Sequence, residues 1–322
     1  MTIRTDLIRS AARATEALGP AACGQVRGFL DLRRRDGGFA GRTDQSDLYY
    51  TVFGLQAWQA LGGENESPPI DPDYLRSFSR GDDLDFVHLC CLIRCRACLF
   101  DDEGGARGAD LHGATPKRSS GVRDDLVPSL RQRLLTFRLG DGGFSHSGAG
   151  RSSAYGCFLG LAALQDLDEM EHGGAGQPPV EGAAELLACL SRLRCDGGGY
   201  ANPPADVPSA PATAGALVAL AQLGRPGDDE SVRRLLALRS ADGGFRANDL
   251  TPVADLLSTA TALHALGASG VDLQPMRQQT LDFLSGLWSP RGGFRGHVFD
   301  GEIDCEYTFY GLLAAGTLAV TP

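Results

Sequence analysis

The sequence predicts an all-α fold in which six inner helices form a ring and six outer helices surround it. Three observations predict it: a Gly-Gly-aromatic tripeptide recurs along the chain, an amphipathic stretch precedes each copy, and a more apolar stretch follows it. A helix with one charged face lies at the surface, whereas a helix with few charges is buried on both sides. Buried helices inside amphipathic ones close naturally into a ring.

The Gly-Gly-aromatic tripeptides divide the chain into repeats. Glycine allows the positive φ of a tight turn, and the aromatic ring can pack between neighbouring units. The first interval is about twice the later ones, so one copy is missing near residue 85, where Gly81 is a candidate remnant. This indicates six repeats of roughly 50 residues. The tripeptides lie at 37–39, 142–144, 198–200, 243–245 and 292–294.

Each repeat is predicted to contain one outer and one inner helix. The expected outer helices lie at 25–34, 73–80, 130–139, 181–194, 231–240 and 277–288. The expected inner helices lie at 49–62, 86–100, 154–167, 212–224, 256–267 and 307–319. We expect one domain over residues 1–322, with a polar, mobile insertion at 101–125 and a linker rich in Gly and Pro at 172–182.

Composition excludes several classes of protein. With 43% hydrophobic and 22% charged residues, the chain can bury a core, so disorder is excluded despite 43 glycines in 322 residues. The net charge of -10 and the lack of a basic block exclude a nucleic-acid partner. No apolar stretch is long enough for a transmembrane segment, and the N-terminus does not resemble a secretory signal. The nine cysteines lie mostly in apolar stretches, as in a cytoplasmic protein with reduced thiols.

The helix–GGF–helix repeats end in the pattern D-x-x-x-T-x-x-G-L, seen at 47–55 and 304–312. In this the chain resembles the β subunits of protein prenyltransferases and, more distantly, the squalene and terpene cyclases. The layout is most similar to a protein geranylgeranyltransferase β subunit, and the resemblance covers nearly the whole chain. It implies an α/α toroid whose apolar central cavity holds an isoprenoid chain.

The first position of the inner helices is predicted to be a helix N-cap, where Asp and Ser side chains accept hydrogen bonds from free N–H groups. We expect the aspartates mainly to cap their helices. A capping carboxylate at a cavity can also do chemistry, because a helix N-terminus favours negative charge. The aligned positions are Asp47, Asp85, Ser153, Ser209 and Asp304, with Pro252 or Asp255 in the fifth repeat.

The residue three positions later shares a helix face with the cap. In a closed ring the sixth, first and second repeats are neighbours, so their polar residues should form one arc of the cavity mouth. The third and fourth repeats offer only small residues in this column. We therefore predict that the functional site lies on the polar arc. In repeat order the column reads Tyr50, His88, Gly156, Ala212, Asp255 and Tyr307.

The resemblance to protein prenyltransferases implies one zinc ion held by an Asp-x-Cys pair and by a His of the last repeat. Here Tyr307 stands at the His position. If Asp255 matches the Asp, Leu257 stands at the Cys position. The stricter alignment places Pro252 at the Asp position and Ala254 at the Cys position. We therefore predict no metal and no cofactor, with zinc as the alternative.

A second candidate for a metal site is the series His88, Cys91, Cys95 and Cys98, which lies along one stripe of a single predicted helix. One helix rarely supplies four ligands to a metal, and free cysteine is among the most buried residue types. We interpret the stripe as part of the core.

The resemblance to class II cyclases implies a protonated carboxyl at the start of an inner helix and aromatic rings that stabilise carbocations. The D-x-D-D motif of those enzymes is absent, but Asp304-x-Glu306 resembles part of it, and a second acidic cluster lies at 82–85. The alternative interpretation is that half of these acids are solvated loop charges. The predicted catalytic residues are Asp304, Glu306, Tyr307, Asp85 and His88.

Further inner-helix residues are predicted to contact the substrate. Trp58 has the alternative interpretation of a packing residue. The predicted substrate-binding residues are Asp47, Tyr50, Phe53, Trp58, Asp255, Phe309 and Tyr310.

Together these features predict an isoprenoid-handling enzyme with acid chemistry at the mouth of an apolar cavity, either cyclase-like or a divergent prenyltransferase. One alternative is a zinc-dependent protein prenyltransferase β subunit with an α partner. The other is a non-catalytic toroid that binds a lipid or a protein. The expected partner is an isoprenoid or another apolar small molecule, with a protein partner or a homo-oligomer as a further expectation.

Overall fold

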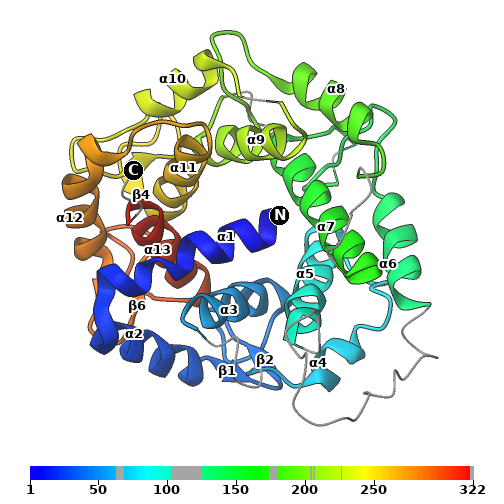
Figure 1. The fold of residues 1–322 in the computed structure, drawn as a ribbon, viewed down its shortest axis with the longest axis horizontal. Helices are drawn as coiled ribbons and strands as arrows, with labels where there is room; N and C mark the ends of the chain where they lie inside the picture. Colours follow the sequence, from blue (N-terminus) through cyan, green and yellow to red (C-terminus); the bar gives the residue numbers. More distant parts are fainter. Residues whose placement is uncertain are drawn as a thin grey trace.

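The computed structural model describes residues 1–62, 69–102, 125–148, 150–173, 180–203, 205, 207–225 and 227–319. Within them, six inner helices surround a common axis, which confirms the all-α toroid (Figure 1). Each inner helix packs against the next, and the last returns to the first. The inner helices are α3 (Leu48–Ala60), α5 (Phe86–Asp102), α7 (Ala154–His172), α9 (Ala210–Gln222), α11 (Leu256–Ala268) and α13 (Cys305–Leu318).

The outer helices lie where the amphipathic stretches predict them, outside the ring of inner helices (Figure 1). They are α2 (Ala14–Leu32), α4 (Pro72–Ser77), α6 (Leu126–Leu135), α8 (Ala183–Leu193), α10 (Asp229–Ala237) and α12 (Arg277–Leu287), with the short 3-10 helix η2 (Gln274–Met276) before α12. The predicted insertion at 101–125 and the linker at 172–182 fall mostly outside the described residues. No helix in the described part of the chain is long and apolar enough to cross a membrane.

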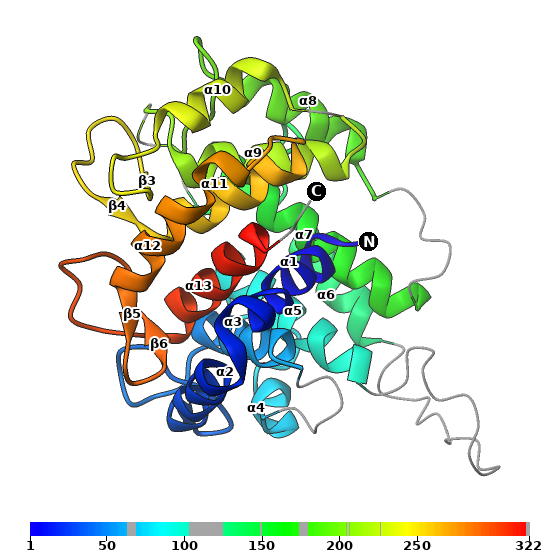
Figure 2. The same ribbon diagram turned by 60° about the vertical axis from the view of Figure 1, so that its left-hand side comes forward.

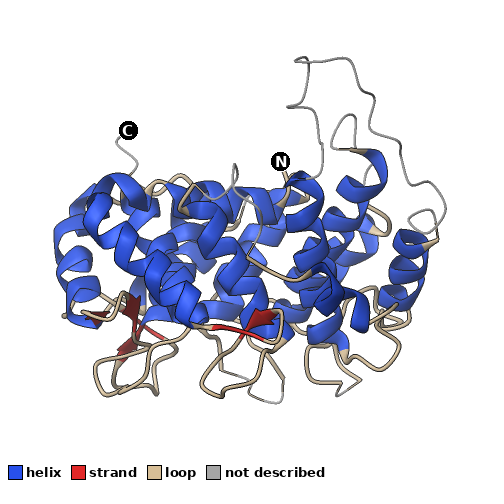
Figure 3. Ribbon diagram, turned by 90° about the horizontal axis from the view of Figure 1, so that it is seen from below, coloured by secondary structure: helices blue, strands red, loops and turns tan. Residues whose placement is uncertain are grey.

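The Gly-Gly-aromatic turns lie at one end of the ring (Figure 3). The first glycine of each turn has a positive φ; at Gly292 it is 93°. A Cβ on Gly292 would lie 2.1 Å from the carbonyl oxygen of Gln25 in α2, so only glycine fits this turn. Short antiparallel pairs accompany three of the turns: β1 (Arg34–Arg35) with β2 (Gly38–Phe39), β3 (Phe245–Arg246) with β4 (Ala254–Asp255), and β5 (Trp288–Ser289) with β6 (Gly293–Phe294).

The D-x-x-x-T-x-x-G pattern has a packing explanation, which the first repeat illustrates. The backbone N–H of Phe39 donates to Thr51 Oγ1 at 3.0 Å, which fixes the turn to the inner helix. The buried Phe39 ring then covers Gly54, where a Cβ would come within 2.5 Å of the ring. The threonine therefore holds the aromatic turn, and the glycine makes room for its ring.

The second repeat lacks the aromatic turn and fills the space differently. Leu89 and Leu92 of α5 stand where α3 has its threonine and glycine, and both leucines are fully buried. Gly81, with a φ of 75°, packs beneath Leu89. Leucine side chains from the helix thus replace the ring that the missing turn would have supplied.

The N-cap prediction is confirmed for the inner helices whose caps are described. The side chains of Asp47, Ser153, Ser209 and Asp304 each accept a backbone N–H of the following turn. In the fifth repeat the cap is Asp255, so the strict alignment to Pro252 is wrong. Pro252 lies in the loop before β4, and the inner helix begins after Asp255.

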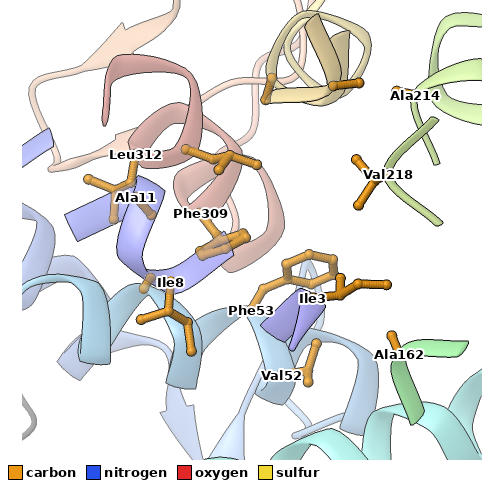
Figure 4. Packing of buried hydrophobic residues seen from close by; sticks show 14 of the residues in the cluster. Ile3, Ile8, Ala11, Val52, Phe53, Ala162, Ala214, Val218, Phe309 and Leu312 are labelled. Atoms are coloured by element: carbon orange, nitrogen blue, oxygen red, sulfur yellow. The ribbon is translucent and has the colours of Figure 1, made fainter. Parts of the chain in front are cut away.

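A helix that the repeat pattern did not predict, α1 (Ile3–Ala12), lies across the hole of the ring (Figures 1 and 2). It packs against the second halves of the inner helices, opposite the aromatic turns; Arg4 Nε, for example, lies 3.0 Å from Asp166 Oδ1 of α7. Its apolar residues Ile3, Ile8 and Ala11 are buried inside the ring (Figure 4). The helix closes one end of the central space.

Candidate active site

The ring encloses a cavity of about 380 Å³ to which all six inner helices contribute. The residues two and six positions after the N-cap line it in every repeat. Four residues separate these two columns, which places them on one helix face. The first column is Tyr49, Val87, Tyr155, Pro211, Leu257 and Glu306, and the second is Phe53, Cys91, Leu159, Gly215, Thr261 and Tyr310.

This register differs by one residue from the column chosen from the sequence. The residue three positions after the cap was expected at the cavity mouth, and the residue before it lines the cavity wall. On the cavity wall the third repeat therefore contributes the large side chain of Tyr155, whereas the predicted column has the small residues Gly156 and Ala212 in the third and fourth repeats. His146 and Asn202, from the turns of these repeats, also line the cavity.

Glu306, in the first turn of α13, is the carboxyl group of the cavity wall. The Tyr49 hydroxyl of the neighbouring α3 donates to Glu306 Oε1 at 2.7 Å. Burial, with the nearby charge of Asp304, raises the pKa of Glu306 to about 7, against the opposing hydrogen bond from Tyr49. Burial also raises the pKa of the Tyr49 phenol, so Tyr49 stays a hydrogen-bond donor. Near neutral pH a large fraction of Glu306 therefore carries a proton.

Asp304, two residues earlier, has a different environment. Its Oδ1 accepts the Tyr307 N–H as the helix cap, and its Oδ2 accepts Arg42 Nε at 3.0 Å. The same guanidinium binds Asp300 Oδ2 at 2.7 Å. Burial raises the pKa of Asp304, while Tyr307 N–H and Arg42 oppose the rise. Both oxygens of Asp304 are thus engaged, whereas Glu306 has a neutral phenol as its partner.

A second, more polar pocket of about 350 Å³ opens beside the cavity, and Glu306 lines both spaces. We call it the mouth pocket. Because the inner helices begin there, it lies at the end of the ring that carries the aromatic turns. Its lining is Arg42, Tyr50, His297, Phe299, Asp300, Asp304, Glu306 and Tyr307.

Aromatic rings surround the cavity side of Glu306. Tyr49 and Phe53 meet edge to face with 5.1 Å between ring centroids, and Phe53 lies 5.4 Å from Tyr310. Phe309 lies 6.0 Å from Phe53 (Figure 4). Aromatic ring faces attract a cation that lies within about 6 Å of the ring centroid. Because these rings line the cavity, they can stabilise positive charge on a molecule bound beside the acid.

The other predicted residues divide by location. Phe53, Phe309, Tyr310 and Glu306 line the cavity, and Tyr50, Asp304 and Tyr307 line the mouth pocket. Trp58, Asp47, Asp85, His88 and Asp255 belong to neither described lining, and Trp58 is buried in the core.

His88 joins two of the predicted aspartates at the ends of α3 and α5. Its Nδ1 lies 2.9 Å from Asp85 Oδ1, and its Nε2 lies 3.7 Å from Asp47 Oδ2. Asp47 and Asp85 together raise the pKa of His88 to about 9, so the imidazole is protonated at neutral pH. The polar arc therefore exists, but in its first two repeats it is an ion-paired rim beside the cavity.

The residues present do not fit the zinc site of the protein prenyltransferases. Tyr307 replaces the histidine, and Leu257 puts an apolar side chain on the cavity wall at the cysteine position. The nearby Cys305 is fully buried with its thiol directed at the carbonyl oxygen of Ala40. Among the described residues, no group of three or more His, Cys, Asp and Glu side chains could hold a metal ion.

Several functional candidates were not found from the sequence. Tyr49 was passed over for its neighbour Tyr50, although its four-residue spacing from Phe53 was a signal that both share a face. Arg42 reaches Asp304 from 262 positions away in a loop, and no local pattern indicates such a contact. Arg94, also on the cavity wall, was not singled out because it lies in a mostly apolar stretch.

Comparison with known proteins gives one family and a set of similar folds. The family described as the prenyltransferase alpha-alpha toroid domain matches residues 25–76, 139–235 and 226–321, which is most of the chain. A variant of the type II terpene cyclase MstE from Scytonema, in complex with its substrate geranylgeranyl dihydroxybenzoate, has 14% identity and a TM-score of 0.53 over 96% of this chain and 97% of that chain.

A second MstE variant, in complex with the product merosterolic acid A, aligns with the same identity of 14% and TM-score of 0.53 over 98% of both chains. At this identity the likeness shows the fold alone. No curated protein sequence matches the chain.

Proposed function

Since the chain belongs to the prenyltransferase α/α-toroid family, we propose that it is an isoprenoid-handling enzyme in which Glu306 protonates an alkene of a polyprenyl chain held in the central cavity. One observation carries the proposal: a carboxyl group with a pKa raised to about 7 lies on the wall of an apolar, aromatic-lined cavity. A general acid works best when its pKa is near the operating pH.

The proposed step needs no co-reactant. The Glu306 O–H bond breaks, a C–H bond forms at one alkene carbon, and the other carbon becomes a cation. The next double bond of the chain attacks this cation and closes a ring. Loss of a proton to water then yields a cyclic isomer of the substrate. The rings of Tyr49, Phe53 and Tyr310 lie where they can stabilise the intermediate cations.

The position of Glu306 between two spaces supports turnover. After proton transfer the carboxylate keeps the hydrogen bond from Tyr49 and the attraction of Arg42. The mouth pocket, lined by polar side chains, would return a proton from solvent to Glu306, while the apolar lining limits the water that reaches the cation before the ring has closed. Glu306 can therefore be reprotonated without opening the cavity.

The test is incubation with geranylgeranyl dihydroxybenzoate, the substrate of MstE, followed by chromatography and mass spectrometry. We expect an isomer of unchanged mass in H₂O. When the reaction is run in D₂O and the O–H groups are then exchanged back in H₂O, we expect an isomer one mass unit heavier. Glu306→Gln should abolish the product, whereas Glu302→Gln, the same change at an exposed loop position nearby, should not.

Two results would contradict the proposal. A product that persists in Glu306→Gln would show that another group supplies the proton. If isoprenoids bind in the cavity and every one tested is recovered unchanged, a non-catalytic binding toroid is favoured instead. A protein partner and a cytoplasmic location stay predictions of the sequence.

A further inference from the structure

A second polar level lies deeper in the cavity. Nine residues after the N-cap, five of the six inner helices contribute a lining residue, and three of these are polar. Seven residues of helix separate this level from Glu306, which is roughly 10 Å along the axis. Between the two levels the lining is mostly apolar. The residues at the deeper level are Gln56, Arg94, Val218, His264 and Leu313.

Arg94 of α5 brings a guanidinium group to this wall. Its Nε donates to Asp166 Oδ2 at 3.0 Å, and its side chain is 11% exposed. No hydrogen bond among the described residues uses its two terminal nitrogens, so their donors remain for a bound molecule. Arg94 is also the one Lys or Arg residue in the described lining of the cavity.

Gln56 of the adjacent α3 lies at the same level. Its side chain is 2% exposed, lines the cavity, and has an Nε2 with no hydrogen-bond partner within the described structure. An unsatisfied buried amide is costly, so such a group usually has a partner that the protein itself does not supply. Across the ring, His264 Nε2 lies 3.3 Å from Asp6 Oδ2 of α1, which covers this end.

We infer that Arg94 and Gln56 form a subsite for the carboxylate head of an isoprenoid acid, whose hydrocarbon tail reaches Glu306. The inference rests on the proposed function, because that function supplies the tail. Two donor groups on adjacent helices match the two oxygens of a carboxylate, and guanidinium nitrogens bind such oxygens strongly. A diphosphate head would bring several negative charges to a single arginine that already shares Asp166.

The matched ligands are farnesoic acid and farnesol, which share a tail and differ in the head group. Binding is measured by calorimetry in the Glu306→Gln background, so that no turnover disturbs it. We expect the acid to bind roughly tenfold to a hundredfold more tightly than the alcohol, the range for a hydrogen bond to a charged group. Arg94→Met should abolish this preference.

Gln56→Leu should reduce the preference by several-fold. Because Gln56 Nε2 has no hydrogen-bond partner within the described structure, this variant removes no hydrogen bond of that group. It therefore tests the subsite even if Arg94→Met folds poorly. The matched control is Arg131→Met, because Arg131 binds Asp168 of the same helix α7 but does not line the cavity. It should leave the preference unchanged.

Equal affinity for acid and alcohol would overturn the subsite and leave the proposed function standing. A preference for the acid that survives both Arg94→Met and Gln56→Leu would also overturn it. If neither ligand binds, the isoprenoid cavity itself is refuted, and the subsite with it.

Discussion

Each end of the central cavity has a buried carboxyl group, and the two groups have different partners. At the end closed by α1, Asp166 is fully buried between two guanidinium groups, with Arg4 Nε and Arg94 Nε each 3.0 Å from one of its oxygens. At the other end, Glu306 has the Tyr49 hydroxyl as its hydrogen-bond donor, and Arg42 of the mouth pocket is engaged by Asp300 and Asp304. One carboxyl is an ion-pair partner, and the other has a pKa raised to about 7 by burial.

The difference shows that burial alone does not decide what an acid does. A buried carboxyl group that is well paired holds its cations in place, whereas burial without a paired cation raises the pKa of the carboxyl group. The same α/α ring provides both cases because α1 brings Arg4 to one end and no equivalent helix enters the described mouth pocket.

Replacing the proposed proton donor, Glu306, should have the largest effect of the changes considered. Glu306→Gln is expected to lower the cyclisation rate by roughly a hundredfold to ten-thousandfold, the usual contribution of a general acid. Product formation per unit time is the measurement. At pH 5 the protonated Glu306 and the glutamine are both uncharged and similar in size, so the melting temperature should change little. A large fall in melting temperature would mean that the lost activity reflects lost folding and not the lost acid.

Breaking the ion-paired end should affect stability instead. Asp166→Asn leaves two buried guanidinium groups without their shared anion, and such a loss typically costs roughly 3–5 kcal/mol of unfolding free energy. Urea unfolding measures it. Glu169→Gln is the control, because this residue also binds Arg4 but is 17% exposed; an equal loss in both variants would argue against a special role for Asp166.

The pH dependence of the rate and of the stability should follow the titration of Glu306. Glu306 must be protonated to act, so the rate should fall about tenfold per unit as the pH rises above about 7. The contribution of Glu306 to the free energy of unfolding also falls as the pH rises. Its pKa is higher in the folded protein than the ordinary 4.5, so protonation stabilises the fold at low pH, and this contribution is lost as the pH rises through about 7.

Thermal unfolding of wild type and Glu306→Gln between pH 5 and 8 measures this contribution. The wild type should lose stability relative to the variant as the pH rises. A constant difference in melting temperature between the two proteins across this range would mean that Glu306 titrates at its ordinary pKa. The carboxyl groups at the two ends of the cavity would then not differ in the way that the burial of Glu306 indicates.

The smallest effect concerns the single hydrogen bond to the acid. The Tyr49 hydroxyl favours the ionised form of Glu306, so Tyr49→Phe should raise its pKa further and move the falling limb of the rate profile to higher pH by less than about one unit. Tyr50→Phe, one residue away in the mouth pocket, should leave the limb in place. A shift to lower pH in Tyr49→Phe would contradict the hydrogen-bond assignment.

Much of the fold could be predicted because its signals are local. Gly292 must be glycine for its turn, Thr51 and Gly54 hold the aromatic turn, and Asp304 caps its helix. All of these depend on neighbours within one repeat, so the pattern in the sequence carries them. The helix α1 was not predicted because it belongs to no repeat.

The candidate site was predicted less completely. Glu306, Phe53 and Tyr310 were chosen and do line the cavity, but Tyr49 was displaced by Tyr50 through an error of one position. One residue is about 100° of helix rotation, so a small error in register turns a side chain from the cavity to the mouth. Asp255 as the cap of α11 was the alternative that the structure selected.

The sequence by itself determined the repeat, the alternation of inner and outer helices, and the presence of a carboxyl group at the start of the last inner helix. Only the tertiary structure decided that Arg42 pairs with Asp304 while Glu306 is left to a phenol, and that α1 places Arg4 beside Asp166. Helical period and turn geometry are properties of neighbouring residues, whereas the charge state of a buried acid depends on partners that ring closure brings from far along the chain.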